Sequence, residues 1–349
     1  MTVSVAAGQN YYGAGNGVEG YAGKFIPEIW SGKLQQKFYD STVLSAIANT
    51  DWEGEIRDQG DKVKIRTVPS ITINDYTKGL ALTSEVPATS IVELNIDKGH
   101  YFSVVADDID KTQADLRLMD IFSNDAAQQM KIKIDTNVLA GIVGGADSAN
   151  RGASKATPLG GRIDQNIPLG FYAATTPTTN AIAVAIDPAS SAGSGAASTK
   201  RTPLDHLLDL GQVMDEQNLP ESGRFVVVPA WFAAMLKKGD LKNVYVSGDA
   251  TSIARNGQVG TIDRFTVYVS NLLPKLYGAT GIPDTNGGTG KTGYSVFAGV
   301  KEGLTFASQV TKVETLRSQA TFGDIMRGLN VYGYKVVTPK ALVESLVTK

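Results

Sequence analysis

The chain has 349 residues, more than one hydrophobic core usually serves, so its length predicts two or more lobes. It contains no cysteine and only two histidines, which excludes disulfides, thiolate chemistry and multi-histidine metal centres. A formal net charge of −2 does not indicate a nucleic-acid-binding chain, and a hydrophobic content of 42% excludes wholesale disorder.

Targeting and membrane signals are not visible in the sequence. No stretch reaches the roughly 18 apolar residues that a membrane-spanning helix needs. The first residues lack the basic start and apolar run of a secretory signal. We therefore expect no membrane association, and a chain that stays in the cytoplasm unless a larger assembly carries it out.

The N-terminal segment, residues 1–23, is rich in Gly, Ala, Asn and Tyr and has no periodicity, which predicts a flexible arm. Its tyrosines, Tyr11, Tyr12 and Tyr21, are unusual for a fully solvated tail. Aromatic side chains bury a large area on a partner, so they favour an arm that docks. A free tail is the alternative interpretation.

Alternating side chains predict strands in the next part of the chain. Residues 61–68 and 91–96 alternate in character, and residues 101–106 form a last strand. We predict that these strands make one long β-hairpin with little apolar content at its tip. Such a hairpin cannot bury itself. Its tip, which carries Asp75 and Lys78, therefore lies on another subunit or moves freely.

The strongest periodic signal predicts a very long helix over residues 107–144. Apolar side chains recur three and four residues apart, and Gly144-Gly145 ends the pattern. At ~1.5 Å per residue this helix is on the order of 50 Å long, which suits a strut. The side chains predicted to form its buried stripe are Met119, Phe122, Met130, Ile134 and Val138.

The rest of the chain predicts a mixed region of helices and strands. Residues 145–202 are rich in Ala, Gly, Ser and Thr, which indicates an inserted surface region or a long loop. Helices are predicted over 204–218 and 230–238, and strands over 224–228 and 265–269, with shorter extended pieces toward the C-terminus.

Two clusters could suggest ligand chemistry, and each has a plainer interpretation. Residues 287–292, GGTGKT, resemble the end of a phosphate-binding loop, but position 285 is Thr where that loop needs Gly, and no apolar strand precedes it. Asp107, Asp108 and Asp110 could bind a divalent ion, but acids at these positions are typical of a helix start. We predict neither a nucleotide site nor a metal site.

The two histidines also lack the pattern of a catalytic base. His100 is expected at the surface end of a strand, and His206 on a solvated helix face beside Asp205 and Asp209. A catalytic histidine needs a nucleophile and an orienting acid in space, and no motif supplies them. We predict no catalytic residue and no cofactor.

The order of these segments resembles the major capsid protein of tailed bacteriophages, over most of the stretch from residue 25 to 140 and from 203 to 337. Residues 25–49 (FIPEIWSGKLQQKFYDSTVLSAIAN) look like the arm that leads into the first helix, and residues 60–77 (GDKVKIRTVPSITINDYT) look like the ascending strand of the extended loop. Residues 102–139, from FSVVADD to TNVL, look like the descending strand running into the spine helix. Residues 224–239 (RFVVVPAWFAAMLKKG) look like the start of the central lobe.

This resemblance implies an α+β fold, the tailed-phage major capsid fold. Its parts are an N-terminal arm, an extended β-hairpin loop, a long spine helix, and peripheral and axial lobes. The implied division is an arm over 1–40, a hairpin loop over 51–106, a peripheral lobe with the spine helix and the insertion over 107–202, an axial lobe over 203–312, and return strands over 313–349.

The resemblance also implies a structural function without catalysis. Subunits would form the pentamers and hexamers of an icosahedral phage head, enclosing double-stranded DNA without sequence-specific contacts. The implied partners are other copies of the chain and scaffolding, portal and decoration proteins. The implied location is the virion, after assembly in the cytoplasm of the bacterial host. The arm and the hairpin tip would join subunits, so the candidate contact residues are Tyr11, Tyr12, Tyr21, Asp75 and Lys78.

Two other functions fit parts of the sequence. An encapsulin-like compartment uses a similar subunit but encloses enzymes, so the contents of purified particles distinguish it from a phage head. A soluble α/β hydrolase or binding module would need a clustered triad or a concave apolar pocket, and the sequence supplies no triad. Some capsid proteins of this kind cross-link covalently through a Lys and an Asn. No motif identifies such a pair here, so we expect assembly without covalent bonds between subunits.

Overall fold

The computed structural model describes residues 39–52, 62–69, 71–81, 84–87, 91–108, 118–152, 167–170, 181–186, 201–239, 260–276, 292–318 and 322–349. These residues belong to one compact unit, Phe38–Lys349. The arm tyrosines, the loop-like residues 287–291 and most of the predicted insertion lie outside the described residues. The predicted domain boundaries therefore stay predictions.

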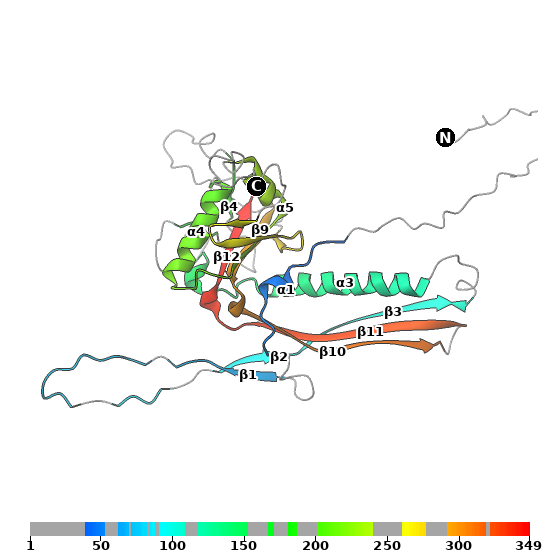
Figure 1. The fold of residues 1–349 in the computed structure, drawn as a ribbon, viewed down its shortest axis with the longest axis horizontal. Coiled ribbons are helices and arrows are strands. Elements are labelled where there is room, and N and C mark those ends of the chain that lie inside the picture. Colours follow the sequence, from blue (N-terminus) through cyan, green and yellow to red (C-terminus); the bar gives the residue numbers. More distant parts are fainter. Residues whose placement is uncertain are drawn as a thin grey trace, which may run out of the picture. The chain divides into compact units, whose positions relative to one another are not determined.

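A seven-stranded mixed sheet forms the larger core (Figure 1). Its strand order is β4-β12-β9-β5-β7-β6, and β8 pairs with β9. β5 is parallel to β7 and antiparallel to β9, and all its residues are buried, which explains its continuous hydrophobic run. The strands are β4 (Ile182–Ala183), β5 (Arg224–Val228), β6 (Thr261–Ile262), β7 (Phe265–Val269), β8 (Lys275–Leu276), β9 (Gly293–Val300) and β12 (Leu342–Thr348).

Helices α4 (Pro203–Glu216) and α5 (Ala230–Lys238) pack against this sheet. Thr202 begins α4, because its side chain accepts a hydrogen bond from the amide of Asp205 at 3.1 Å and Pro203 fits the first turn. The core between helices and sheet includes Leu210, Phe232, Val226, Phe265 and Val296. Both helices and the two main strands predicted from the sequence in this region are thus confirmed.

A second sheet has three antiparallel strands, in the order β10-β11-β3. They are β10 (Leu304–Arg317), β11 (Gly323–Val336) and β3 (Lys98–Asp107). Helix α3 (Leu118–Gly141) runs beside this sheet (Figure 1). Short 3-10 turns occur at Ser148–Asn150, Lys301–Gly303 and Pro339–Ala341.

The predicted hairpin is correct in its first two strands and wrong in its third. β1 (Lys62–Arg66) pairs with β2 (Ile91–Asn95) in antiparallel register, as expected. The strand predicted over 101–106 is present, but as part of β3 it pairs with β11 over ten residues and leaves the hairpin. β2 pairs with all five residues of β1, so β3, which is longer, forms its hydrogen bonds with β11 instead.

Helix α3 occupies the centre of the predicted long helix. Its described part has 24 residues, about 36 Å at ~1.5 Å per residue, and ends at Gly141, just before Gly144 turns the chain with a φ of 75°. Ile134 and Val138 are buried in a cluster shared with α1 (Leu44–Ile47) and the large sheet.

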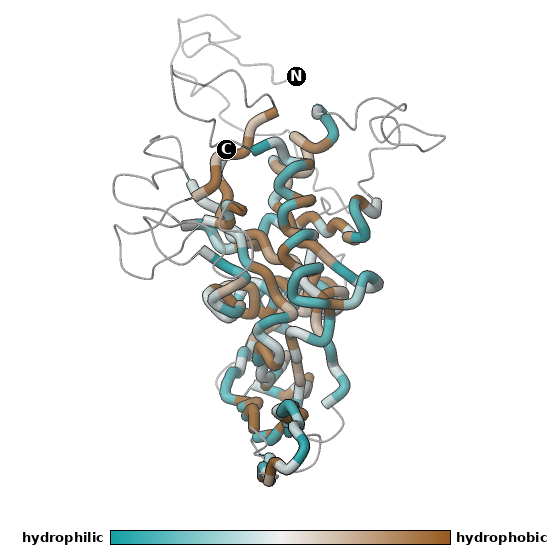
Figure 2. The backbone as a smooth tube through the Cα atoms, turned by 90° about the vertical axis from the view of Figure 1, so that its left-hand side faces the viewer, coloured by the Kyte–Doolittle hydropathy of each residue, from teal (hydrophilic) through white to brown (hydrophobic). Residues whose placement is uncertain are grey.

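The N-terminal half of α3 is less buried than the predicted stripe implies. Met119, Phe122 and Met130 are half-buried, and Met130 packs against the cluster that contains Ile134 and Val138. The C-terminal half packs in a cluster with α1 and the large sheet, whereas no described residue of α3 before Met130 belongs to that cluster. Figure 2 shows hydrophobic and hydrophilic residues alternating along the tube of the backbone.

Candidate interaction surfaces

The hairpin loop beyond β1 exposes large apolar side chains. Val68, Ile73 and Val86 are 94%, 89% and 90% exposed. Ile71, Tyr76 and Leu80 are exposed as well. Residues 71–81 pair with no strand in the described structure, although the amide of Thr72 donates to Glu85 across the loop at 3.1 Å. Contiguous apolar exposure of this kind marks a surface that another molecule covers.

The tip of the hairpin loop is a hydrogen-bonded turn. The amide of Leu80 donates to the carbonyl of Thr77 at 3.0 Å, and Gly79 has a φ of 93°, which only glycine adopts freely. Asp75 precedes this turn, Lys78 lies within it, and both side chains are exposed. Neither forms an ion pair with another residue in the described ranges, so both charges are available to a partner.

The face of the small sheet opposite α3 carries a second apolar surface. Tyr101 and Leu329 are paired in register on neighbouring strands, and both are exposed, Tyr101 at 80%. Val105 lies on the same face and is 52% exposed. Beside them Glu314 is paired with Arg327 and with Lys312 at 3.1 Å, and these cations lower the pKa of the Glu314 carboxyl. We call this surface the outer face of the sheet.

Only one end of the outer face is covered within the described subunit. There the base of the hairpin packs Val63, Ile65 and Leu94 against Ala307. Trp52, at the root of the hairpin, packs onto this cluster. Gly333 lies against the backbone carbonyl of Asn95, an approach that a side chain at this position would prevent. The hairpin is therefore anchored at its base and unsupported at its tip.

The acidic cluster of residues 107–110 stands where β3 ends, and Asp108 is helical, which agrees with the predicted helix start. Asp107 is the last residue of β3, and Asp108 forms an ion pair with Arg317, which also contacts Asp324 at 3.3 Å. Asp110 lies outside the described residues. The described ranges hold no group of three acidic or histidine side chains that could bind a metal ion.

His100 is not the surface residue that the sequence suggested. It is half-buried in β3, and its Nε2 atom lies 2.8 Å from the Asn137 amide nitrogen and 3.1 Å from the Tyr332 hydroxyl. Asn137 belongs to α3 and Tyr332 to β11, so this network fixes the helix to the sheet.

His206 is fully buried rather than on a solvated helix face. Its Nε2 atom lies 2.9 Å from the Ser345 hydroxyl, and burial, aided by the nearby Arg201, lowers the pKa of His206 to about 4. Its Nδ1 atom has no hydrogen-bond partner among the described residues, so no acid orients the ring for catalysis. The histidine is therefore a neutral packing residue that joins α4 to β12.

Two buried carboxylates were not predicted from the sequence. Asp135 on α3 accepts a hydrogen bond from the amide of Val43 at 2.7 Å, and burial raises its pKa to about 6. Glu344 on β12 accepts one from the amide of Gly144 at 2.6 Å, and burial raises its pKa to about 7. Only Glu344 had a sequence signal, as an acid in the largely apolar run 341–347. Asp135 connects α3 to the start of α1, and Glu344 connects β12 to the turn that follows α3.

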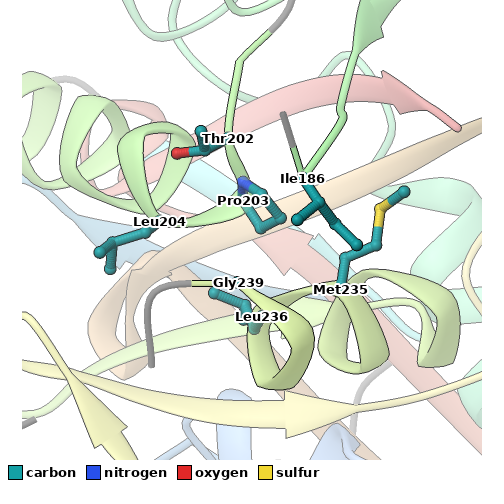
Figure 3. A pocket seen from close by; sticks show the side chains of 7 residues that line it. All are labelled: Ile186, Thr202, Pro203, Leu204, Met235, Leu236 and Gly239. Atoms are coloured by element: carbon teal, nitrogen blue, oxygen red, sulfur yellow. The ribbon is translucent and has the colours of Figure 1, made fainter. Parts of the chain in front are cut away.

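The cavities near α4 and near Glu344 are too small for a substrate. Figure 3 shows the first, where Pro203 and Leu204 of α4 face Met235 and Leu236 of α5. It has a volume of about 10 Å³, and the cavity beside Glu344 has about 20 Å³. Such volumes hold at most about one water molecule. No helix within the described ranges is long and apolar enough to cross a membrane.

The combination of an arm-proximal helix, a long hairpin, a long helix beside a three-stranded sheet, and a larger mixed sheet is the α+β fold of phage capsid proteins. A structure from Mycobacterium phage Che8 has a TM-score of 0.65 at 24% identity, covering 92% of this chain and 96% of that one. The capsid of Cyanophage P-SCSP1u gives 0.63 at 18% identity, covering 92% of both chains. The mature capsid of bacteriophage PhiM1 gives 0.57 at 16%, covering 91% and 90%. No curated protein matches the chain.

The family described as phage capsid protein matches residues 91–345. This range is more than half of the chain. The chain therefore belongs to the phage capsid protein family, and it is a structural component of a virion capsid.

Proposed function

We propose that this chain is the subunit that closes into the icosahedral head of a tailed phage, through pentamers and hexamers that enclose double-stranded DNA. The observation that carries the proposal is the apolar hairpin loop, with Val68, Ile73 and Val86 almost fully exposed in the isolated subunit. Burial of apolar surface contributes roughly 25 cal/mol per Å², so contacts between copies would be favoured by these side chains. Solved structures with this fold include the capsids of Cyanophage P-SCSP1u and bacteriophage PhiM1.

The contacts between copies follow from the two exposed surfaces. Asp75 and Lys78 at the hairpin tip would fix the register of a contact through complementary charge, and the outer face of the sheet would supply an apolar counterpart. The arm tyrosines Tyr11, Tyr12 and Tyr21 would add area on a neighbouring copy. The role is structural and non-catalytic. Scaffolding, portal and decoration proteins would be its further partners, with assembly in the cytoplasm of the bacterial host.

Electron microscopy of the purified full-length chain, expressed alone and with phage scaffolding protein, tests the proposal. We expect closed shells of uniform size, and one band near the monomer mass on a denaturing gel of boiled shells, because the subunits associate without covalent bonds. Monomers alone under all conditions would contradict the proposal. A ladder of multimers would contradict its non-covalent part, and particles from phage-infected cells that hold enzymes instead of DNA would favour the encapsulin-like alternative.

A further inference from the structure

A groove of about 420 Å³ lies between α1, the C-terminal half of α3 and the strands β10 and β11. Leu44, Ile134 and Phe306 give it an apolar wall, and the hydroxyl-bearing residues Thr42 and Ser45 also line it. Pockets that hold small organic ligands have volumes of about 300–1,000 Å³ and a similar mixture of apolar and polar walls. The groove is distinct from the hairpin loop and from the outer face of the sheet.

A buried carboxylate also lines the groove. Asp135 is 1% exposed, and its Oδ2 atom accepts the hydrogen bond from Val43. No described donor meets hydrogen-bond geometry at its Oδ1 atom, although the backbone amide of Leu44 also lies close enough to the carboxylate to lower its pKa. An unpaired buried acceptor costs free energy that a donor bound in the groove would recover, and a cationic donor would recover more. Burial raises the pKa of Asp135 to about 6, so the group is mainly ionised at pH 8.

We propose that this groove binds a primary ammonium group on a short apolar stem. The ammonium donates to Oδ1 of Asp135, and the stem packs on Leu44, Ile134 and Phe306. An ammonium has three donors, so it can also donate to the hydroxyls at the rim of the groove. An anion would be repelled by the carboxylate, and a purely apolar ligand would leave Oδ1 without a donor.

Among the described residues that line the groove, one carries an ammonium group. Lys131 lies one helical turn before Asp135, lines the groove and is exposed. Among the ion pairs within the described residues, none joins it to Asp135. The variant Lys131→Met removes this ammonium. It therefore tests whether Lys131 itself, rather than an added ligand, is the counter-ion of Asp135.

Binding of n-butylammonium to the full-length protein at pH 8, measured by saturation-transfer NMR, tests the proposal. We expect a dissociation constant on the order of millimolar, since a ligand of five heavy atoms offers little contact area. Asp135→Asn should weaken binding about tenfold or more, because it removes the charge while keeping the shape. The matched control is Asp120→Asn, an exposed acid on the same helix, and it should bind like the parent. Lys131→Met should bind equally well or more tightly.

Three results would overturn the proposal. One is that the parent protein does not bind n-butylammonium, even if the Lys131→Met variant does. Another is unchanged binding by a folded Asp135→Asn variant, with folding checked by circular dichroism. The third needs no variant: n-butanol or butyrate binding to the parent protein as tightly as n-butylammonium would show that charge plays no part.

Discussion

At the scale of single residues, burial rather than residue type decides what each side chain does. The apolar stripe of the long helix shows this most clearly, since Ile134 and Val138 are buried while Phe122 is half-buried. The same holds for polar groups. His206, predicted at the surface, is buried and neutral, and Glu344 and Asp135 are acids within apolar surroundings.

The two halves of α3 should respond differently to truncation. Leu139→Ala removes a fully buried side chain and should lower the free energy of unfolding by about 2–5 kcal/mol. Phe122→Ala should cost less in the isolated subunit, because its ring is already half solvated. Urea titration of assembly-incompetent subunits measures both values. Equal losses would contradict the burial difference along the helix.

Glu344 should make the subunit less stable at alkaline pH. Its pKa is about 7 in the folded state and 4.5 when solvated, so the folded state holds the proton more tightly. Its contribution is fully present below pH 4.5 and is lost as the pH rises through 7, a loss on the order of 3 kcal/mol. Glu344→Gln should therefore gain stability relative to the parent between pH 5 and pH 8.

The control for this comparison is Glu302→Gln, which changes an exposed acid. His206 acts in the opposite direction, because its lowered pKa removes stability as the pH falls below 6.5. It is present in both variants and cancels in the difference. Urea midpoints that shift in parallel for parent and Glu344→Gln over this pH range would show that Glu344 titrates normally.

At the scale of elements, local sequence patterns predicted which segments form helices and strands. They did not predict which strands pair, because the partners lie far apart along the chain. The run RFVVV and the helix after it were predictable because a fully buried strand is a short continuous apolar run and an amphipathic helix has a periodic apolar pattern. The pairing of β3 with β11 joins residues more than 200 positions apart, and alternation alone does not choose between partners. The positions of the buried acids Asp135 and Glu344 follow no repeating sequence pattern, so periodicity could not predict them.

The hairpin tip should act in assembly and not in folding. Asp75→Lys combined with Lys78→Asp reverses both exposed charges without touching the hairpin base. We expect an unchanged urea midpoint for the subunit, since neither side chain packs in its core, and a reduced yield of shells at low salt, where charge complementarity is strongest. Sedimentation measures the yield. Parental yields at both low and high salt would exclude a contact through these charges.

At the scale of the whole molecule, the described subunit has well-packed cores and unusually exposed outer elements. The seven-stranded sheet and its helices bury most of their apolar side chains, whereas the hairpin loop and the outer face of the sheet leave large ones exposed. Apolar surface that a monomer leaves uncovered is stabilised when another copy covers it. Because the chain belongs to the phage capsid protein family, other copies of the chain are the expected molecules that cover this surface.

The arm should contribute to the shell more than to the subunit. Deletion of residues 1–23 removes Tyr11, Tyr12 and Tyr21 together with a Gly-rich stretch that adds little to an intramolecular core. We expect a soluble, folded subunit whose shells melt at a lower temperature than full-length shells, because the aromatic contacts between copies are lost. Differential scanning calorimetry of purified shells measures this, and identical melting temperatures would refute docking by the arm.

A cryo-electron microscopy map of the assembled particle, at a resolution that shows side chains, tests most directly whether the exposed surfaces of the subunit are its assembly contacts. We predict a closed shell in which Val68, Ile73 and Val86, together with Tyr101 on the outer face of the sheet, are covered by neighbouring copies. A shell in which the hairpin loop and the outer face both remain open to solvent, with the copies joined through other surfaces, would contradict this account.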